Sequence, residues 1–243
     1  MELIIIRHGQ STNNVTMMSD PFAREADPPL TALGLAQAQR LAAHLANGPN
    51  LEDRVVQLPG APNLPRGCGL TRLLCSPMRR ALQTAQPAAA ALGLPVEVWV
   101  DVHEHGGLYL LGPDGEGQGF PGLTADEMRA QFPGCVIPPE VTDQGWWNPA
   151  RGKEDLAGCM ARAVRVAARL RGWAETQERV ALVTHGTFAD KLLKALYSAL
   201  PGDGLQHWLY NASLTRLDFH KDGRLTLRYL NRVDHLEGDL VSS

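Results

Sequence analysis

The chain has 243 residues, of which 44% are hydrophobic and 20% are charged, and its formal net charge is −3. These values are typical of a soluble globular protein with a sizeable core. Because there is no basic excess, the composition argues against nucleic acid or an anionic membrane as a partner. A small anionic substrate stays compatible with it, since a few local arginines can hold one.

Cysteine usage and the N-terminus indicate a reduced, cytoplasmic protein. The four cysteines form no C-x-x-C pair, which argues against a zinc knuckle, and the chain is too Cys-poor for a disulfide scaffold. The apolar run in MELIIIRHG is too short for a signal peptide. No stretch approaches the roughly 18 apolar residues of a membrane span. A dimer is one alternative for the oligomeric state.

The first part of the chain alternates strand and helix patterns. The β-branched run at residues 3–6 predicts a strand that is buried on both faces. Thr31 is the expected N-cap of a helix over residues 31–46. Residues 47–69 contain four prolines and little periodicity, which predicts a loop or an insertion.

A second strand and helix follow this loop. Residues 70–75 predict a strand, and Ser76-Pro77 predicts a helix start with serine as N-cap. We expect that helix to kink or end near Pro87. Residues 96–100 predict a third strand.

The middle of the chain contains a glycine-rich segment and two helices. Residues 112–122 hold five glycines and two prolines, which predicts a mobile loop. Thr124 is the expected cap of a short helix, and residues 155–176 predict the longest helix. On that helix three arginines are expected to form a solvated face: Arg162, Arg165 and Arg169.

The last elements complete an α/β pattern. Residues 180–183 predict a buried strand, residues 188–200 a helix, and residues 214–219 and 225–230 a hairpin around an Asp-Gly turn. Strands that alternate with helices predict a three-layer α/β/α sandwich with a mainly parallel sheet. The hairpin would add an antiparallel edge.

We expect one domain over residues 1–243. No domain boundary is visible in the composition, so residues 104–155 are interpreted as an insertion after the third strand that shapes a substrate pocket.

Two of the predicted strands end in the same way, in IIIRHG and in ALVTHG. His8 and His185 therefore follow two strands of one sheet, and ligands of open α/β sheets bind beyond the carboxyl ends of the strands. Gly9 and Gly186 permit a tight turn and a close approach of backbone to ligand. A single histidine here would be interpreted as structural, but two of them with Arg7 adjacent favour a site.

The SPMRRA segment points to an anion. Arg79 and Arg80 lie in the expected first turn of a helix, where the helix dipole disfavours cations by roughly 0.3–1 kcal/mol each. An anion bound at that helix start would explain them, because N–H groups and guanidinium would converge on it. The alternative is that both arginines point into solvent.

These motifs together resemble the histidine phosphatase superfamily, which includes the cofactor-dependent phosphoglycerate mutases. RHGQSTNN, LTALGLAQA, SPMRRALQTA, Glu104 and a late strand followed by THG occur in the order typical of that superfamily, from residue 3 to about residue 215. Gln10 departs from the pattern, since many relatives carry glutamate there.

The resemblance implies a role for each matching residue. His8 would become phosphorylated, and Glu104 would be the proton donor, with Asp114 and Glu116 as alternatives. Three residues would hold the phosphoryl group: Arg7, Arg80 and His185. Four further residues are expected to bind phosphate: Asn14, Ser11, Gly9 and Gly186.

The chemistry needs these residue types. Guanidinium groups neutralise phosphate oxygens, which lets a neutral imidazole attack phosphorus. A backbone carbonyl that accepts from the other ring nitrogen would fix the tautomer of His8. Glu104 must be protonated to act as an acid, and a nearby phosphate dianion with partial burial favours that state.

A metal site is the alternative interpretation of His103-Glu104-His105. On a strand the two histidines would share one face and could bind zinc with a partner such as Asp101. The motif context explains Glu104 without a metal, so we expect neither a metal nor another cofactor.

The segment after Glu104 favours hydrolysis over phosphoryl transfer. Mutases of the superfamily carry basic residues there that hold a sugar-acid carboxylate, whereas no Arg or Lys lies between Glu104 and Arg129. A phosphomonoester hydrolase acting on a small phosphorylated substrate is therefore expected. A mutase-like phosphotransferase and a non-catalytic phosphate-binding module are the alternatives. Four aromatic residues could line a leaving-group pocket or belong to the core: Tyr109, Phe120, Trp146 and Trp147.

Overall fold

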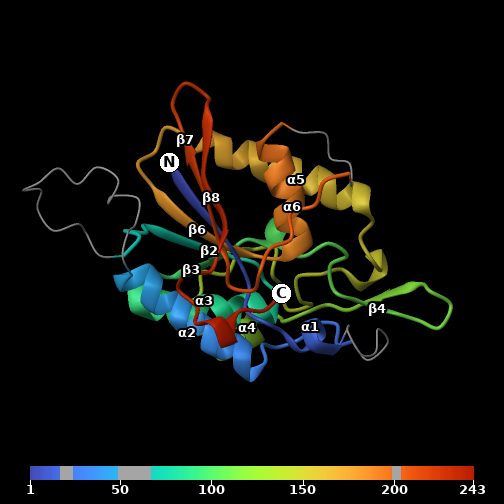
Figure 1. Ribbon diagram of the computed structural model, residues 1–243. Coiled ribbons are helices and arrows are strands. Elements are labelled where there is room, and N and C mark those ends of the chain that lie inside the picture. Colours follow the sequence, from blue (N-terminus) through green and yellow to red (C-terminus); the bar gives the residue numbers. More distant parts are fainter. Residues whose placement is uncertain (17–23, 49–66, 199–203) are drawn as a thin grey trace, which may run out of the picture.

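A mainly parallel sheet runs through the centre of the molecule (Figure 1). This computed structural model describes residues 1–16, 24–48, 67–198 and 204–243. In this part of the chain, six strands pair in the order β3-β2-β6-β1-β7-β8. The strands are β1 (Glu2–Arg7), β2 (Arg72–Cys75), β3 (Val96–Val98), β6 (Arg179–Thr184), β7 (Leu214–Phe219) and β8 (Leu225–Arg232).

The strand directions confirm the predicted sheet. β1, β2, β3 and β6 are parallel to one another, β7 is antiparallel to β1, and β8 is antiparallel to β7. The final hairpin is thus the antiparallel edge. Register places Arg7 of β1 opposite Thr184 of β6, so these two strands end side by side.

Helices cover both faces of this sheet, which confirms the three-layer sandwich (Figure 1). The helices of one face are α2 (Ala32–Asn47) and α3 (Arg79–Leu92), and those of the other are α5 (Leu156–Gly172) and α6 (Gly186–Leu196). Because side chains alternate along a strand, Ile4 and Ile6 of β1 pack in the core on the α2 and α3 side. Leu3 and Ile5 pack in the core beneath α5 and α6.

The expected insertion forms small elements of its own. They are the hairpin β4 (Tyr109–Leu111) and β5 (Gly117–Gly119), α4 (Ala125–Gln131) and a 3₁₀ turn at Pro149–Arg151. The prediction of a loop over 112–122 is wrong for β5, because Gly115, at φ +83°, lets the chain reverse and pair. Leu108, Trp146 and Trp147 share one buried cluster with α2 and α3.

Several element boundaries differ from the predictions. The third strand ends at Val98 and is followed by a 3₁₀ turn, Val100–Val102. α3 continues through Pro87 to Leu92, and buried Ala85 and Ala88 hold this part of the helix in the core. α5 ends at Gly172 rather than at residue 176.

Helix caps follow the sequence more closely. Thr31 caps α2, and Thr124 forms a capping box with Glu127 at α4. A short helix, α1 (Thr12–Thr16), follows the first strand, and a 3₁₀ turn, Gly238–Leu240, lies near the C-terminus. Most of the predicted 47–69 loop, residues 49–66, lies outside the described residues, as do residues 199–200 of the predicted last helix.

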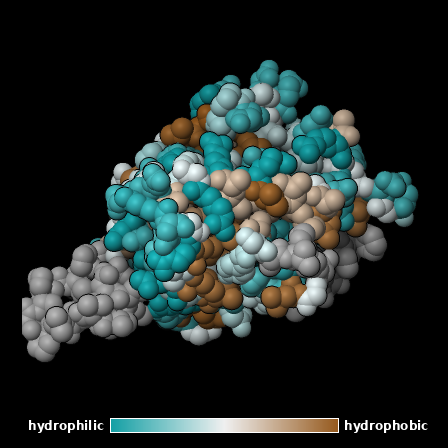
Figure 2. Space-filling model, turned by 90° about the horizontal axis from the view of Figure 1, so that it is seen from above, coloured by the Kyte–Doolittle hydropathy of each residue, from teal (hydrophilic) through white to brown (hydrophobic). Residues whose placement is uncertain are grey.

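The surface seen from above mixes hydrophilic residues with separate hydrophobic patches (Figure 2). Of the helices that the structure describes, none combines the length and the apolar character needed to cross a membrane.

Candidate active site

Three neighbouring parallel strands end at one place in the sheet. His8 follows β1, His185 follows β6, and Ser76 follows β2. The N–H of His8 donates to the carbonyl of Thr184 at 2.9 Å, and the ring centroids of His8 and His185 are 5.0 Å apart. The Oγ atom of Ser76 lies 2.7 Å from Nε2 of His185. The two strand-end histidines that the sequence singled out are therefore in contact.

The tautomer of His8 is fixed by two hydrogen bonds. Its Nδ1 lies 2.6 Å from the carbonyl oxygen of Gly9, which can only accept, so Nδ1 carries the proton. Nε2 accepts from Nε of Arg80 at 3.1 Å. Burial, then Arg80, then Arg7 lower the pKa of His8 well below 6.5. His8 is thus held as a neutral imidazole with its lone pair on Nε2.

Arg80 belongs to the first turn of α3 and is only 8% exposed. The hydroxyl of Thr84, one turn later, donates to the carbonyl of Arg80 at 2.7 Å and accepts the N–H of Gly9 at 3.0 Å. This pair of bonds ties the turn after His8 to the helix that carries Arg80. The possibility that Arg80 points into solvent is therefore wrong.

The start of α3 corrects the predicted cap. Met78 rather than Ser76 occupies the N-cap position, and it makes no side-chain cap hydrogen bond. The Ser76 hydroxyl, which lies before this position, accepts the N–H of Met78 at 3.3 Å and contacts His185. Asp27 supplies the missing anion, since its Oδ1 accepts the N–H of Arg79 at 3.0 Å. A carboxylate of the chain itself thus occupies part of the helix start that was expected to hold a ligand.

Arg7 is the last residue of β1 and lines the pocket next to His8. Its Nη1 donates to the carbonyl of Leu209. Within the described residues its buried Nε has no hydrogen-bond partner. Arg7 therefore retains a donor for a ligand.

Two adjacent asparagines after His8, Asn13 and Asn14, bind different segments of the backbone. Oδ1 of Asn14 accepts both the N–H and the hydroxyl of Ser11, each at 2.9 Å. Asn13 makes two bonds to the backbone of Glu25, through Nδ2 at 2.8 Å and Oδ1 at 3.0 Å. The second pair anchors the segment that begins at Arg24 against α1. Sequence reasoning did not assign Asn13 or Arg24 to the site.

Glu104 reaches the N-terminus of α6. Oε1 accepts the N–H groups of His105 and Phe188, both at 2.8 Å, and Oε2 accepts that of Thr187 at 3.2 Å. These three donors and the positive end of the helix dipole fix the carboxylate beside the pocket. Neither Asp114 nor Glu116, the alternative acids, is among the described residues that line it.

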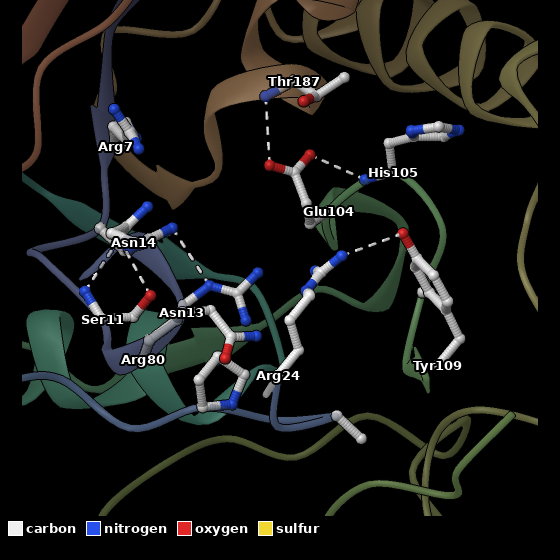
Figure 3. Close-up of a pocket in the computed structure, with 14 residues that line it drawn as sticks. Arg7, Ser11, Asn13, Asn14, Arg24, Arg80, Glu104, His105, Tyr109 and Thr187 are labelled. Atoms are coloured by element: carbon white, nitrogen blue, oxygen red, sulfur yellow. Dashed lines mark hydrogen bonds between the residues drawn. The ribbon is translucent and has the colours of Figure 1, made fainter. Parts of the chain in front are cut away.

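Together these side chains surround a cavity of about 220 Å³ (Figure 3). Six of the residues predicted for the site line it: Arg7, His8, Ser11, Asn14, Arg80 and Glu104. The lining also includes Arg24 and Tyr109, whose hydroxyl lies 3.5 Å from Nη1 of Arg24. Nζ of Lys153 lies 5.2 Å from the centre of the Tyr109 ring. Arg24 and Lys153 therefore bring positive charge to the pocket, although neither belongs to the segment between Glu104 and Arg129.

Three predicted site residues do not line the cavity in the described part of the chain. His185 lies behind His8, whose ring it contacts, and does not itself line the cavity. Within the described residues, its buried Nδ1 has no hydrogen-bond partner. Gly9 packs on α2 rather than on a ligand, because a Cβ at Gly9 would lie 2.7 Å from the carbonyl oxygen of Gly34. A Cβ at Gly186 would lie 3.4 Å from Nε of Arg7.

The structure differs from the geometry that the metal site and the aromatic leaving-group pocket would need. Residue 103 follows a 3₁₀ turn rather than lying on a strand, and Nδ1 of His103 bonds the carbonyl of Val100 at 2.6 Å. Among the described side chains, no group of three His, Cys, Asp or Glu could hold a metal ion. Of the four aromatic residues, Tyr109 lines the pocket, whereas Trp146 and Trp147 are buried in the core.

Comparison with known proteins agrees with this arrangement. The sequence model of the histidine phosphatase superfamily (branch 1) matches residues 3–55 and 61–232. No curated protein matches the chain in sequence.

Solved structures share the fold along the whole chain. A mycobacterial glucosyl-3-phosphoglycerate phosphatase bound to VO3 is 25% identical, with a TM-score of 0.56 over 96% of this chain and 99% of that one. A candidate α-ribazole-5′-P phosphatase of Escherichia coli is 22% identical, with a TM-score of 0.61 over 96% and 97%. An Entamoeba histolytica phosphoserine phosphatase variant in complex with phosphoserine is 21% identical, with a TM-score of 0.57 over 97% and 99%. The match of the family over nearly the whole chain shows that this protein belongs to branch 1 of the histidine phosphatase superfamily.

Proposed function

We propose that this protein is a phosphomonoester hydrolase that forms a phosphohistidine on His8. One observation carries the proposal: His8 is held neutral, with its Nε2 lone pair directed at Arg80, in a pocket that contains three arginines. A neutral imidazole is a good nucleophile only if the negative oxygens of the phosphate are neutralised first. Arg7 and Arg80 are placed to do so.

In the first step Arg80 exchanges its bond to His8 for a phosphate oxygen. Nε2 of His8 then attacks phosphorus, the bond between phosphorus and the ester oxygen breaks, and that oxygen takes a proton from Glu104. The Nδ1–H bond to the Gly9 carbonyl stabilises the positive charge that develops on the ring. The products are phosphohistidine, the free alcohol and the Glu104 carboxylate.

In the second step water replaces the alcohol. Glu104 accepts a proton from the water, whose oxygen attacks phosphorus, and the bond between phosphorus and Nε2 breaks. Phosphate leaves, and both His8 and the protonated Glu104 are regenerated. His185 supports both steps by holding Ser76 and the ring of His8 at the ends of adjacent strands.

The substrate is a small phosphorylated molecule. The cavity of about 220 Å³ accommodates a phosphoryl group with a small leaving group. The related structures act on phosphoserine and on glucosyl-3-phosphoglycerate, both small esters. Arg24 and Tyr109 would meet the leaving group, since they lie on the same side of the pocket as Glu104 (Figure 3).

A phosphotransferase is the second candidate, and Arg24 with Lys153 favours it. Because these cations lie close to Tyr109, the lack of basic residues between Glu104 and Arg129 does not leave the pocket without positive charge. A sugar-acid phosphate could therefore be retained for transfer. The two functions differ in whether phosphate is released.

The test is hydrolysis of p-nitrophenyl phosphate by the wild type and by His8→Ala, with His220→Ala in the distant hairpin as control. We expect His8→Ala to lower kcat/KM by at least about 10⁴-fold, and the control to match the wild type. Labelled substrate should give an acid-labile, alkali-stable phosphoenzyme in the wild type and in the control, and none in His8→Ala.

Other outcomes separate the alternatives. Activity that survives in His8→Ala would exclude a histidine nucleophile. Isomerisation of a phosphoglycerate without release of phosphate would indicate the phosphotransferase. Binding of phosphate without turnover of any ester would indicate the non-catalytic module.

A further inference from the structure

We infer that Arg162 is a positioning residue that, with Glu154, holds Glu104 in place for proton transfer. This inference rests on the proposed role of Glu104 as proton donor. Arg162 was expected on the solvated face of the long helix, yet it is 2% exposed, whereas Arg165 and Arg169 are exposed as predicted. It is not among the described residues that line the pocket, so it would act through Glu104.

The guanidinium of Arg162 makes a two-bond ion pair with Glu154. Nε lies 3.0 Å from Oε1 and Nη2 lies 2.5 Å from Oε2. Both side chains are about 95% or more buried. Burial of two charges is costly unless their geometry and hydrogen bonding are nearly complete. The Arg162 guanidinium meets this requirement with further hydrogen bonds.

Those further contacts lie on the chain just before Glu104. Nη1 of Arg162 donates to the carbonyl of Asp101 at 2.8 Å and to that of His103 at 2.7 Å. The second acceptor belongs to the residue directly preceding Glu104. The N–H of Glu154 donates to the carbonyl of Gly106 at 3.0 Å, just beyond it. The Arg162 side chain therefore holds the backbone before Glu104, and the backbone of its ion-pair partner Glu154 holds the backbone after it.

Arg162 also contacts Phe188, whose backbone N–H binds the Glu104 carboxylate. Its guanidinium carbon lies 4.5 Å from the centre of the Phe188 ring, a cation–π contact. The N–H of Phe188 donates to Oε1 of Glu104 at 2.8 Å. One side chain thus fixes both the loop that carries Glu104 and the helix start that orients its carboxylate. A shift of either would move the proton away from the ester oxygen.

The experiment compares two substrates on the same enzyme sample. The leaving group of p-nitrophenyl phosphate is a stable anion that needs little protonation, whereas the alkoxide of glycerol phosphate needs a proton to depart. Values of kcat/KM report the steps up to the transfer of phosphorus to His8, in which this proton moves. The ratio of the two values does not depend on how much of the sample is folded.

We expect Glu104→Gln to lower kcat/KM for glycerol phosphate at least about tenfold more than for p-nitrophenyl phosphate. Arg162→Met should shift the ratio in the same direction. Arg162→Lys keeps the charge but lacks the planar fork, so it should shift the ratio less than Arg162→Met. Arg165→Met, on the exposed face of the same helix, should leave both values unchanged. Combined with Glu104→Gln, Arg162→Met should add little further change to the ratio.

The outcomes separate the two claims. If Glu104→Gln lowers both substrates equally, the proposed role of Glu104 is wrong. If Glu104→Gln shifts the ratio but Arg162→Met and Arg162→Lys lower both substrates equally, Arg162 only stabilises the fold and the inference is overturned. Should Arg162→Met not fold, Arg162→Lys and Glu154→Gln decide by the same ratio.

Discussion

The two sides of the pocket are built in different ways. On one side Arg7 and His8 lie at the end of β1, and Arg80 lies in the first turn of the helix that follows β2. On the other side Arg24 and Glu104 come from irregular segments. Sheet register places the first group, whereas buried side-chain contacts place the second. The phosphate side can therefore be recognised from local sequence, and the leaving-group side depends on residues distant in the chain.

Apart from the loss of the nucleophile in His8→Ala, the largest effect is expected on the phosphate side, from Arg80→Met. Its loss removes a cation that faces the phosphate and the N–H that holds Nε2 of His8. We expect kcat to fall about 10²–10³-fold, the usual cost of losing one preorganised donor. Kinetics on p-nitrophenyl phosphate measure this.

The matched control for Arg80→Met is Arg79→Met. Arg79 is the neighbouring side chain on α3, and only its backbone N–H is used by Asp27. We expect activity within a factor of about two of the wild type. Equal losses in the two variants would show that general positive charge, rather than the position of Arg80, supports the reaction.

Three buried histidines, two of them on the phosphate side, should also make the fold sensitive to acid. Burial is the first cause that lowers the pKa of His8, His103 and His185 well below 6.5. Protons bind these histidines more tightly in the unfolded chain, so stability is complete above pH 6.5 and is lost as pH falls below it. Burial raises the pKa of Asp27 to about 6. Below that pH the folded protein binds a proton at Asp27 that the unfolded chain does not, which offsets part of the loss of stability.

The net change can be measured by urea unfolding. Burial also lowers the pKa of His44, His105 and His235, so between pH 7 and pH 5.5 we expect the free energy of unfolding to fall by more than the roughly 1 kcal/mol of a single buried imidazole. In His185→Asn the fall should be smaller by about 1 kcal/mol, since one buried imidazole is removed. Stability that does not change over this range would mean that the histidines are protonated in the folded protein.

The contrast between the two sides explains what the sequence could predict. An apolar run followed by His-Gly identifies β1 and β6, and their parallel pairing then brings His8 and His185 together without further information. Ser76 was misassigned as the cap because α3 begins at Arg79, later than Ser76-Pro77 indicated, while the Ser76 hydroxyl binds both the N–H of Met78 and His185. The contact with His185, which is distant in sequence, is not visible in the local pattern.

Arg24 and Arg162 show the same limit on the leaving-group side. Helical periodicity separated Arg162 from the apolar stripe, but the acid that allows its burial, Glu154, lies before the helix begins. Arg24 precedes a segment that Asn13 anchors, and no motif marks it. Both would have required knowledge of the tertiary contacts. Glu104 was found only through its place in the family pattern.

Apart from the control variants, the smallest effect on activity is expected from Arg24→Met, and it should depend on the substrate. Phosphoglycerate and glycerol phosphate differ mainly in a carboxylate, which the Arg24 guanidinium beside Tyr109 would bind. We expect Arg24→Met to lower kcat/KM for phosphoglycerate about tenfold, the value of one charge-assisted hydrogen bond, and to change glycerol phosphate little. Equal losses on both would place Arg24 on the phosphoryl group itself. The phosphate side would then extend across the pocket to a residue that the sheet does not position.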